Sequence, residues 1–207
     1  MITTRFCKRE DFGPLCAAED AFHATKLSFP EAPLFGVAKV SPPWSWRPDH
    51  ILSAVRRYKS KKTGEFDTRA IVAQLTHKIL DSKTGKLEEL AETVGGIIYE
   101  TADDSYEILL LTVNPNKLGG VPLEAVLDTL LERVLRKAEN SERRTRVRFH
   151  IPDGSYRLLK FFQDKKVSGE ATWPYKRVDS YFADGSDAWL VEYQAAVTAE
   201  EEHEVGA

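Results

Sequence analysis

The spacing of hydrophobic positions changes several times along this chain, and each change marks a predicted element. From Leu123 to Ala138, apolar side chains recur every three to four residues and charged side chains occupy the opposite face. This spacing predicts an amphipathic helix. Similar spacing predicts three shorter helices, at residues 12–26 with Asp11 as a cap, at residues 49–58, and at residues 153–162.

Runs rich in β-branched and aromatic residues predict the strands. Residues 68–80, a segment ending at residues 95–100, and residues 106–115 are separated by turn-forming sequences, and they predict an antiparallel meander. Gly85 in the first turn can take a positive φ. Further strands are predicted at residues 2–6, 147–151, 177–182 and 188–194.

The segment 27–48 differs from the rest of the chain because it combines several prolines with aromatic residues, Trp44 and Trp46 among them. Proline disfavours regular structure, whereas the aromatic side chains favour burial. We interpret it as an irregular arm that packs on the domain or lines a cleft. The remaining pattern predicts one domain over residues 1–197 and an acidic, disordered tail at 198–207.

The composition excludes several classes of protein. Of the 207 residues, 42% are hydrophobic and 29% are charged, which is enough for both a core and a soluble surface. The net charge of −3 predicts no general attraction to nucleic acid or to anionic membranes, so the basic runs at 56–62 and 143–146 are interpreted as solvated faces. Two cysteines make neither a disulfide framework nor a zinc set. We therefore expect a cytoplasmic protein without a metal, a signal peptide, or a nucleic-acid or membrane partner.

The junction between residues 106–115 and the helix that begins near Leu123 is the most informative part of the chain. A buried strand leads into the loop Asn116–Lys117–Leu118–Gly119–Gly120, and the helix follows. Such a junction directs backbone N–H groups and the positive end of a helix dipole at one point. The sequence therefore predicts a site for an anionic cofactor.

The order of the elements, together with local likeness at residues 78–85, 95–98 and 111–115, resembles the GNAT N-acyltransferase superfamily, and the first of these segments with the arm before it resembles the fungal branch. The resemblance implies an α+β, three-layer fold with a mixed, mostly antiparallel central sheet flanked by helices. It also implies acetyl-CoA, or another acyl-CoA, as the co-substrate.

In that family the strand before the loop separates from its neighbour, its backbone pairs with pantetheine, and the loop amides hold the pyrophosphate. The resemblance therefore implies that the following residues bind the cofactor: Leu111, Thr112, Val113, Lys117, Leu118, Gly119, Gly120 and Val121.

The chain departs from the family pattern at several positions. Leu118 stands where the loop has Gln or Arg, and Pro122, which has no N–H, lies between the two positions that are usually small. Phe162 stands where the later helix often carries a proton-donating Tyr. The alternative interpretation is that Gly119–Gly120 only forms a turn between strand and helix.

His150, at the end of a strand that flanks the acyl site in this fold, is the candidate proton acceptor, because an unperturbed imidazole titrates near neutral pH. Its alternative role is that of a half-buried histidine at a strand end. Trp44, Trp46 and Trp173 are candidates for a pocket that holds a flat or apolar acceptor, with packing as the alternative for each.

The predicted function is an acyl-CoA-dependent N-acyltransferase, in the first instance an acetyltransferase, that acts as a monomer or homodimer on a small amine or peptide amine by direct attack on the thioester. The alternative is a non-catalytic or repurposed GNAT-like protein that binds a metabolite or a protein partner.

Overall fold

A computed structural model describes residues 1–24, 68–80, 85–153, 155–167, 171–182 and 184–195. The arm at 27–48 with Trp44 and Trp46, the helix predicted at 49–58 and the tail at 198–207 lie outside the described residues.

Seven strands form one sheet in the order β1-β2-β3-β4-β5-β9-β8. Every neighbouring pair in it is antiparallel except β4 and β5, which are parallel. This confirms the predicted mixed, mostly antiparallel sheet and the meander β2-β3-β4. The strand bounds are β1 Ile2–Phe6, β2 Thr68–Leu80, β3 Leu87–Thr101, β4 Ser105–Val113, β5 Arg146–Pro152, β8 Tyr175–Val178 and β9 Ala188–Gln194.

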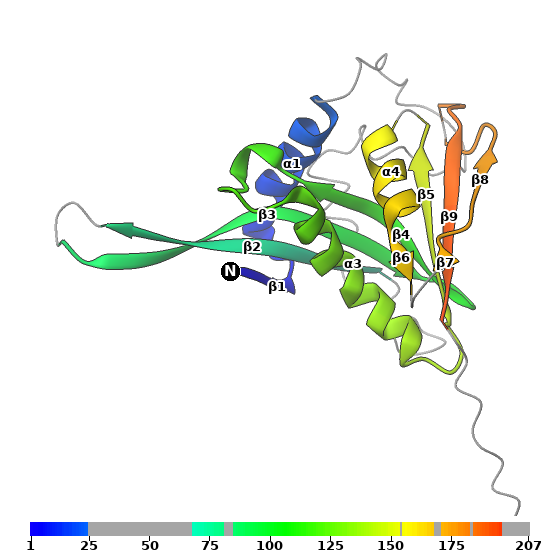
Figure 1. Ribbon diagram of the computed structural model, residues 1–207, viewed down its shortest axis with the longest axis horizontal. Coiled ribbons are helices and arrows are strands. Elements are labelled where there is room, and N and C mark those ends of the chain that lie inside the picture. Colours follow the sequence, from blue (N-terminus) through cyan, green and yellow to red (C-terminus); the bar gives the residue numbers. More distant parts are fainter. Residues whose placement is uncertain (25–67, 81–84, 154, 168–170, 183, 196–207) are drawn as a thin grey trace, which may run out of the picture.

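Helices cover both faces of this sheet (Figure 1). On one face lie α3 (Leu123–Glu139) and α4 (Tyr156–Asp164), and on the other lies α1 (Phe12–Ala24). The apolar stripe of α3 is buried along most of its length, with Leu123 and Leu135 partly buried at its ends, which confirms the amphipathic helix predicted there. On the opposite face, Phe12 and Leu15 of α1 pack in one cluster with Val72 of β2, Ile98 of β3 and Leu110 of β4.

Two glycines of β3 allow this packing because a side chain at either position would collide with its neighbours. A Cβ atom on Gly96 would lie 2.6 Å from Cδ2 of Leu15 and 2.9 Å from the carbonyl oxygen of Ile71. A Cβ atom on Gly95 would lie 2.5 Å from the carbonyl oxygen of Thr112 in β4. Glycine therefore lets α1 and β4 approach β3 closely.

The structure corrects two predicted details. The strand predicted at 177–182 ends at Val178, and Ser180 has a φ of 47° and donates its N–H to the Asp187 carboxylate at 2.8 Å, so the chain turns there. Asp11 does not cap α1. It ends a 3₁₀ turn, η1 (Arg9–Asp11), and its carboxylate accepts hydrogen bonds from the Lys8 N–H and from Nη1 and Nη2 of Arg5 at 2.7 to 2.9 Å.

Two very short strands, β6 (Lys166–Val167) and β7 (Ala171–Thr172), pair with each other outside the main sheet. The sequence does not predict them, because two residues cannot show an alternating pattern.

Candidate functional site

The sheet opens between its two parallel strands. β4 pairs with β5 only from Ser105, opposite Arg146, to Ile108, opposite Phe149. From Leu110 to Val113, β4 pairs with β3 alone among the described strands. We call the point just after the Ile108–Phe149 pair the fork. The separation that the family resemblance implies for this strand is present.

A β-bulge in β4 coincides with the fork. Tyr99 of β3 lies opposite Ile108 and Ile98 lies opposite Leu110, so Leu109 has no partner on β3. An extra residue of this kind bends a strand and increases its twist, which directs the rest of β4 away from β5. The bulge could not be predicted because Leu109 lies in a continuous apolar run, where no alternation reveals an extra residue.

The loop after β4 is held in a defined shape by its own hydrogen bonds. The Asn114 side-chain oxygen accepts the Asn116 N–H at 3.0 Å and begins a short 3₁₀ turn, η3 (Pro115–Lys117). The Val121 N–H then donates to the Leu118 carbonyl at 2.9 Å. Between them, Gly119 and Gly120 have φ values of 54° and 89°, as in a type I′ turn.

Several amide groups of this loop remain available to a ligand. No group in the described part of the chain accepts a hydrogen bond from the N–H groups of Leu118, Gly119, Gly120 or Leu123. These donors lie at and just before the N-terminus of α3, which adds its positive partial charge.

The side chains of the loop add little positive charge to these donors. Lys117 forms an ion pair with Glu92 of β3, so its ammonium is already partly neutralised. Leu118 points inward and is only 8% exposed, in the core cluster under α3. The loop therefore offers backbone donors without a free arginine or glutamine at the position where the family carries one.

A groove of about 560 Å³ lies between the first turns of α3 and the last turns of α4. Its charged residues are Glu124 and Asp128 from α3, Lys160 and Asp164 from α4, and Lys165 at the end of α4. Lys165 and Asp128 form an ion pair across it. Lys160 is exposed at its rim and can supply a positive charge to a phosphate.

A second cavity, of about 440 Å³, lies on the opposite face of the sheet and contains His150. We call it the His150 pocket, and its walls include Glu100, Glu107 and Leu109 from β3 and β4, Arg148 from β5, and Tyr181. The imidazole stacks on the Tyr181 ring with 3.8 Å between centroids and 6° between planes. Its Nδ1 atom lies 4.0 Å from Oε2 of Glu107.

Electrostatics keep His150 neutral. Burial, and then the positive charges of Arg148 and Lys176, lower its pKa from 6.5 to about 4. Burial and the carboxylates of Glu107 and Glu100 raise the pKa of Tyr181 to about 12, so its hydroxyl keeps its proton. At neutral pH the pocket thus pairs an uncharged imidazole, a proton acceptor, with an uncharged phenol.

The structure brings some of the predicted site residues together and separates others. Leu111 to Val113 lie beyond the fork on β4, and the loop from Lys117 to Val121 follows them and leads into α3. His150 lies one residue beyond the fork on β5. Trp173 is 1% exposed, and its ring centroid lies 4.9 Å from that of Phe162 and 5.5 Å from that of Tyr193. Its position fits the packing alternative rather than a pocket open to an acceptor.

Two residues of the His150 pocket are not predicted as site residues by the sequence. The Glu107 carboxylate accepts the Ser105 hydroxyl at 2.9 Å and lies 3.5 Å from Arg148. The sequence carries no signal for this position, because the fork depends on the register of β4 with the distant strand β5. Tyr181 follows an irregular turn, and no signal in the sequence places it on the imidazole.

Two further classes of site are absent from the described residues. They contain no group of three or more His, Cys, Asp or Glu side chains arranged to hold a metal ion. None of their helices has the length and apolar character that a bilayer crossing requires.

Comparison with known proteins shows the fold. No family model matches the sequence, and no curated protein matches it. Among solved structures, Arabidopsis thaliana NAA60 with a bisubstrate analogue superposes with a TM-score of 0.58 and 12% identity, covering 94% of this chain and 98% of that one. PaiA N-acetyltransferase from Thermoplasma acidophilum with coenzyme A gives 0.54 and 16%, covering 94% and 99%.

Spermidine N-acetyltransferase from Vibrio cholerae, in complex with coenzyme A and spermine, gives a TM-score of 0.54 and 11% identity, covering 93% and 95%. The chain therefore has the fold of the GNAT N-acetyltransferases.

Proposed function

We propose that this protein is an acyl-CoA-dependent N-acyltransferase, in the first instance an acetyltransferase, that acts on a small amine or peptide amine. One observation carries the proposal: the open edge of β4 begins at Leu109, and His150 lies one residue beyond Phe149, the last residue of β5 that pairs with β4. A ligand lying along the open edge would thus end beside a neutral imidazole.

The residues at the fork fit acyl-CoA. The free backbone edge from Leu111 to Val113 can pair with the pantetheine amides, and the amides of Gly119 and Gly120 can receive the pyrophosphate, with Lys117, Leu118 and Val121 forming the rest of the turn. When bound, acyl-CoA supplies the thioester and a thiolate leaving group. The backbone donors of the loop and the dipole of α3 would stabilise the negative charge of the pyrophosphate.

His150 acts as the proton acceptor in this proposal. As the amine nitrogen bonds to the carbonyl carbon and the carbon–sulfur bond breaks, the imidazole takes the proton that the nitrogen loses. Its low pKa suffices because the attacking nitrogen becomes strongly acidic as it gains a fourth bond. The stacked Tyr181 ring fixes the orientation of the imidazole.

A second candidate is a non-catalytic GNAT-like protein that binds a metabolite or partner without acetyl-CoA turnover. The engagement of Lys117 by Glu92 favours it, and so does a buried Leu118 side chain where the family carries Gln or Arg, because neither side chain can then bind pyrophosphate. Phe162, fully buried against Phe149, also supplies no proton donor. The cytoplasmic location and the fungal likeness remain predictions under either function.

Titration of coenzyme A by calorimetry tests whether the chain can be the transferase. We expect binding by the wild type and at least about 10-fold weaker binding by Gly120→Ala, since a side chain at φ 89° strains the turn. Gly185→Ala is the matched control: Gly185 has a φ of 82°, and a Cβ atom at either glycine would meet no atom within 4 Å. Absence of heat at millimolar coenzyme A would rule out the transferase.

Turnover is tested with acetyl-CoA and a panel of acceptors that includes polyamines and peptides with free N-termini. Loss of a positioned proton acceptor lowers rates by about 10²- to 10⁴-fold, so His150→Gln should lower kcat in that range while coenzyme A binding stays unchanged. Coenzyme A binding without turnover on any acceptor would favour the second candidate.

A further inference from the structure

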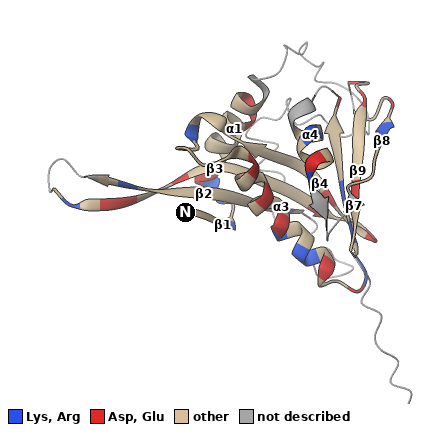
Figure 2. Ribbon diagram, in the orientation of Figure 1, with Lys and Arg blue, Asp and Glu red and all other residues tan. Residues whose placement is uncertain are grey.

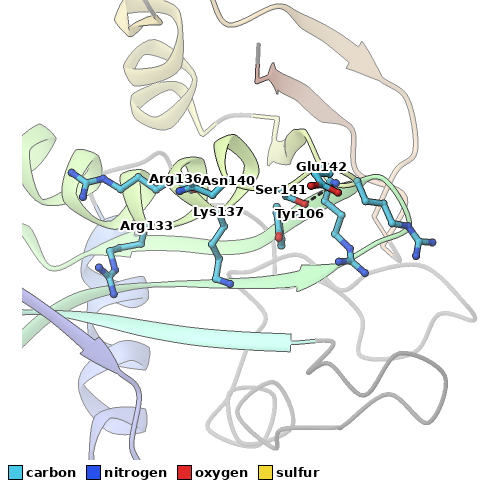
Figure 3. Close-up of a pocket in the computed structure, with 9 residues that line it drawn as sticks. Tyr106, Arg133, Arg136, Lys137, Asn140, Ser141 and Glu142 are labelled. Atoms are coloured by element: carbon cyan, nitrogen blue, oxygen red, sulfur yellow. Dashed lines mark hydrogen bonds between the residues drawn. The ribbon is translucent and has the colours of Figure 1, made fainter. Parts of the chain in front are cut away.

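A third hollow, of about 730 Å³, lies at the far end of α3, where the helix turns into β5 (Figure 3). We call it the basic hollow. Its charged lining residues are Arg133, Arg136, Lys137, Glu142, Arg143 and Arg144. Among the described residues of this lining, five positive charges thus face one negative charge, in a chain whose net charge is −3. Blue segments on the last turns of α3 mark part of this concentration (Figure 2).

Helix capping accounts for only part of this charge. The C-terminus of a helix carries about half a negative charge, which one cation balances. The Asn140 side chain already donates to the Arg136 carbonyl at 2.6 Å, and the Arg136 guanidinium pairs with Glu132 at 2.6 Å. The other four cations exceed what the helix end requires.

These four cations come from two different elements. Arg133 and Lys137 are one turn apart on α3 and extend toward the same side, whereas Arg136 is directed away from them (Figure 3). From the turn, Arg144 donates through Nε to the Ala102 carbonyl at 3.0 Å, which anchors it at the wall. Arg143 lies 4.0 Å from Asp103, and both side chains are exposed, so this pair is weak.

We propose that the basic hollow binds a compact anion that carries two or more phosphate groups. Cations from the helix and from the turn can each meet a separate phosphate of such a ligand. Four of the five cations are arginines, whose planar guanidinium matches phosphate oxygens in pairs. The amide of Asn140 and the hydroxyl of Ser141 add neutral donors to the lining.

Two observations favour a compact ligand over a polymer. The volume lies within the range of small-ligand pockets, about 300 to 1,000 Å³. Tyr106, the one aromatic residue of its described lining, is only 8% exposed, so it offers no platform on which bases of a nucleic acid could stack.

The basic hollow is also separate from the proposed coenzyme A site. The 17 residues of α3 span about 25 Å at 1.5 Å per residue, with the loop of Gly119 and Gly120 at one end and the hollow at the other. One coenzyme A pyrophosphate cannot occupy both places.

Calorimetric titration of sodium tripolyphosphate into the full chain at low salt tests the proposal. We expect Arg133→Gln/Arg143→Gln to weaken binding at least about 10-fold, since a phosphate loses two charge-assisted partners. The matched control is Lys8→Gln/Arg9→Gln, which removes the same charge from two exposed residues just after the edge strand β1 and should change binding less than about 2-fold. Saturating coenzyme A should leave the affinity unchanged.

Three results would overturn the proposal: no binding of tripolyphosphate at millimolar concentration, equal weakening in both double variants, or displacement by coenzyme A. Tighter binding of a single-stranded oligonucleotide or an acidic peptide, lost in Arg133→Gln/Arg143→Gln, would also overturn it, because the hollow would then serve a macromolecule. Thermal unfolding of each variant verifies that it is folded, and all four substituted side chains are exposed.

Discussion

The neutral state of His150 predicts how stability depends on pH. In the folded protein its pKa is about 4, against 6.5 as the ordinary value. Between these two values the unfolded chain binds a proton at this residue and the folded chain does not. Stability therefore falls as the pH is lowered from 6.5 toward 4, by about 3 kcal/mol in full and about 2 kcal/mol by pH 4.5.

The measurement is urea unfolding from pH 7 to pH 4.5 for the wild type and for His150→Gln, whose side chain does not titrate. Other titrating groups contribute to both curves, so the difference between the two slopes isolates His150. The wild type should lose about 2 kcal/mol more than the variant over this range. The side chain is 19% exposed, so the desolvation that lowers the pKa is only partly relieved by water.

Parallel curves for the two proteins would refute the reasoning, and so would an imidazole resonance of His150 that titrates near 6.5. Either result would mean that water reaches the ring from the pocket. Lys176→Gln provides a graded check, because it removes one of the two charges that lower the pKa and should raise it slightly.

Three further predictions concern stability and the loop. Asp11→Ala should destabilise the protein by about 3–5 kcal/mol in urea unfolding, because it leaves Arg5 without its buried carboxylate partner, and a loss below about 1 kcal/mol would contradict this. Gly96→Ala should lower stability by about 1–3 kcal/mol through its clash with Leu15, whereas Gly13→Ala, with no atom within 4 Å, should not lower it. Glu92→Gln should release Lys117 and tighten coenzyme A binding a few-fold by calorimetry, and weaker binding would show that the ion pair holds the loop in its binding shape.

Much of the sheet could be predicted because its strands and helices have distinct periods. β1 and β2 have the predicted bounds, and α3 extends one residue beyond its prediction. The resemblance to the GNAT family, based on the segments around Gly95 and Val113, implied the fold that the solved structures share.

The site was less accessible to sequence reasoning because it depends on registers and long-range contacts. The pairing of Ile108 with Phe149, and the end of that pairing one residue later, has no local signature. The ion pair of Lys117 with Glu92 joins residues 25 positions apart. Trp173 illustrates the opposite case, since the sequence leaves both a pocket and packing open for it and the fold buries the indole.

The opening of the sheet depends on a single extra residue, Leu109, which forms the bulge in β4. Ile108 and Leu111 both contribute to the core under α3. Residues three positions apart on a regular strand face opposite sides of the sheet, so these two share a face only because the bulge at Leu109 adds one residue between them. If Leu109 were deleted, β4 could pair with β5 along the whole length of β5. The sheet would then be continuous between β4 and β5, and a reactant could not pass between these strands from one face to the other.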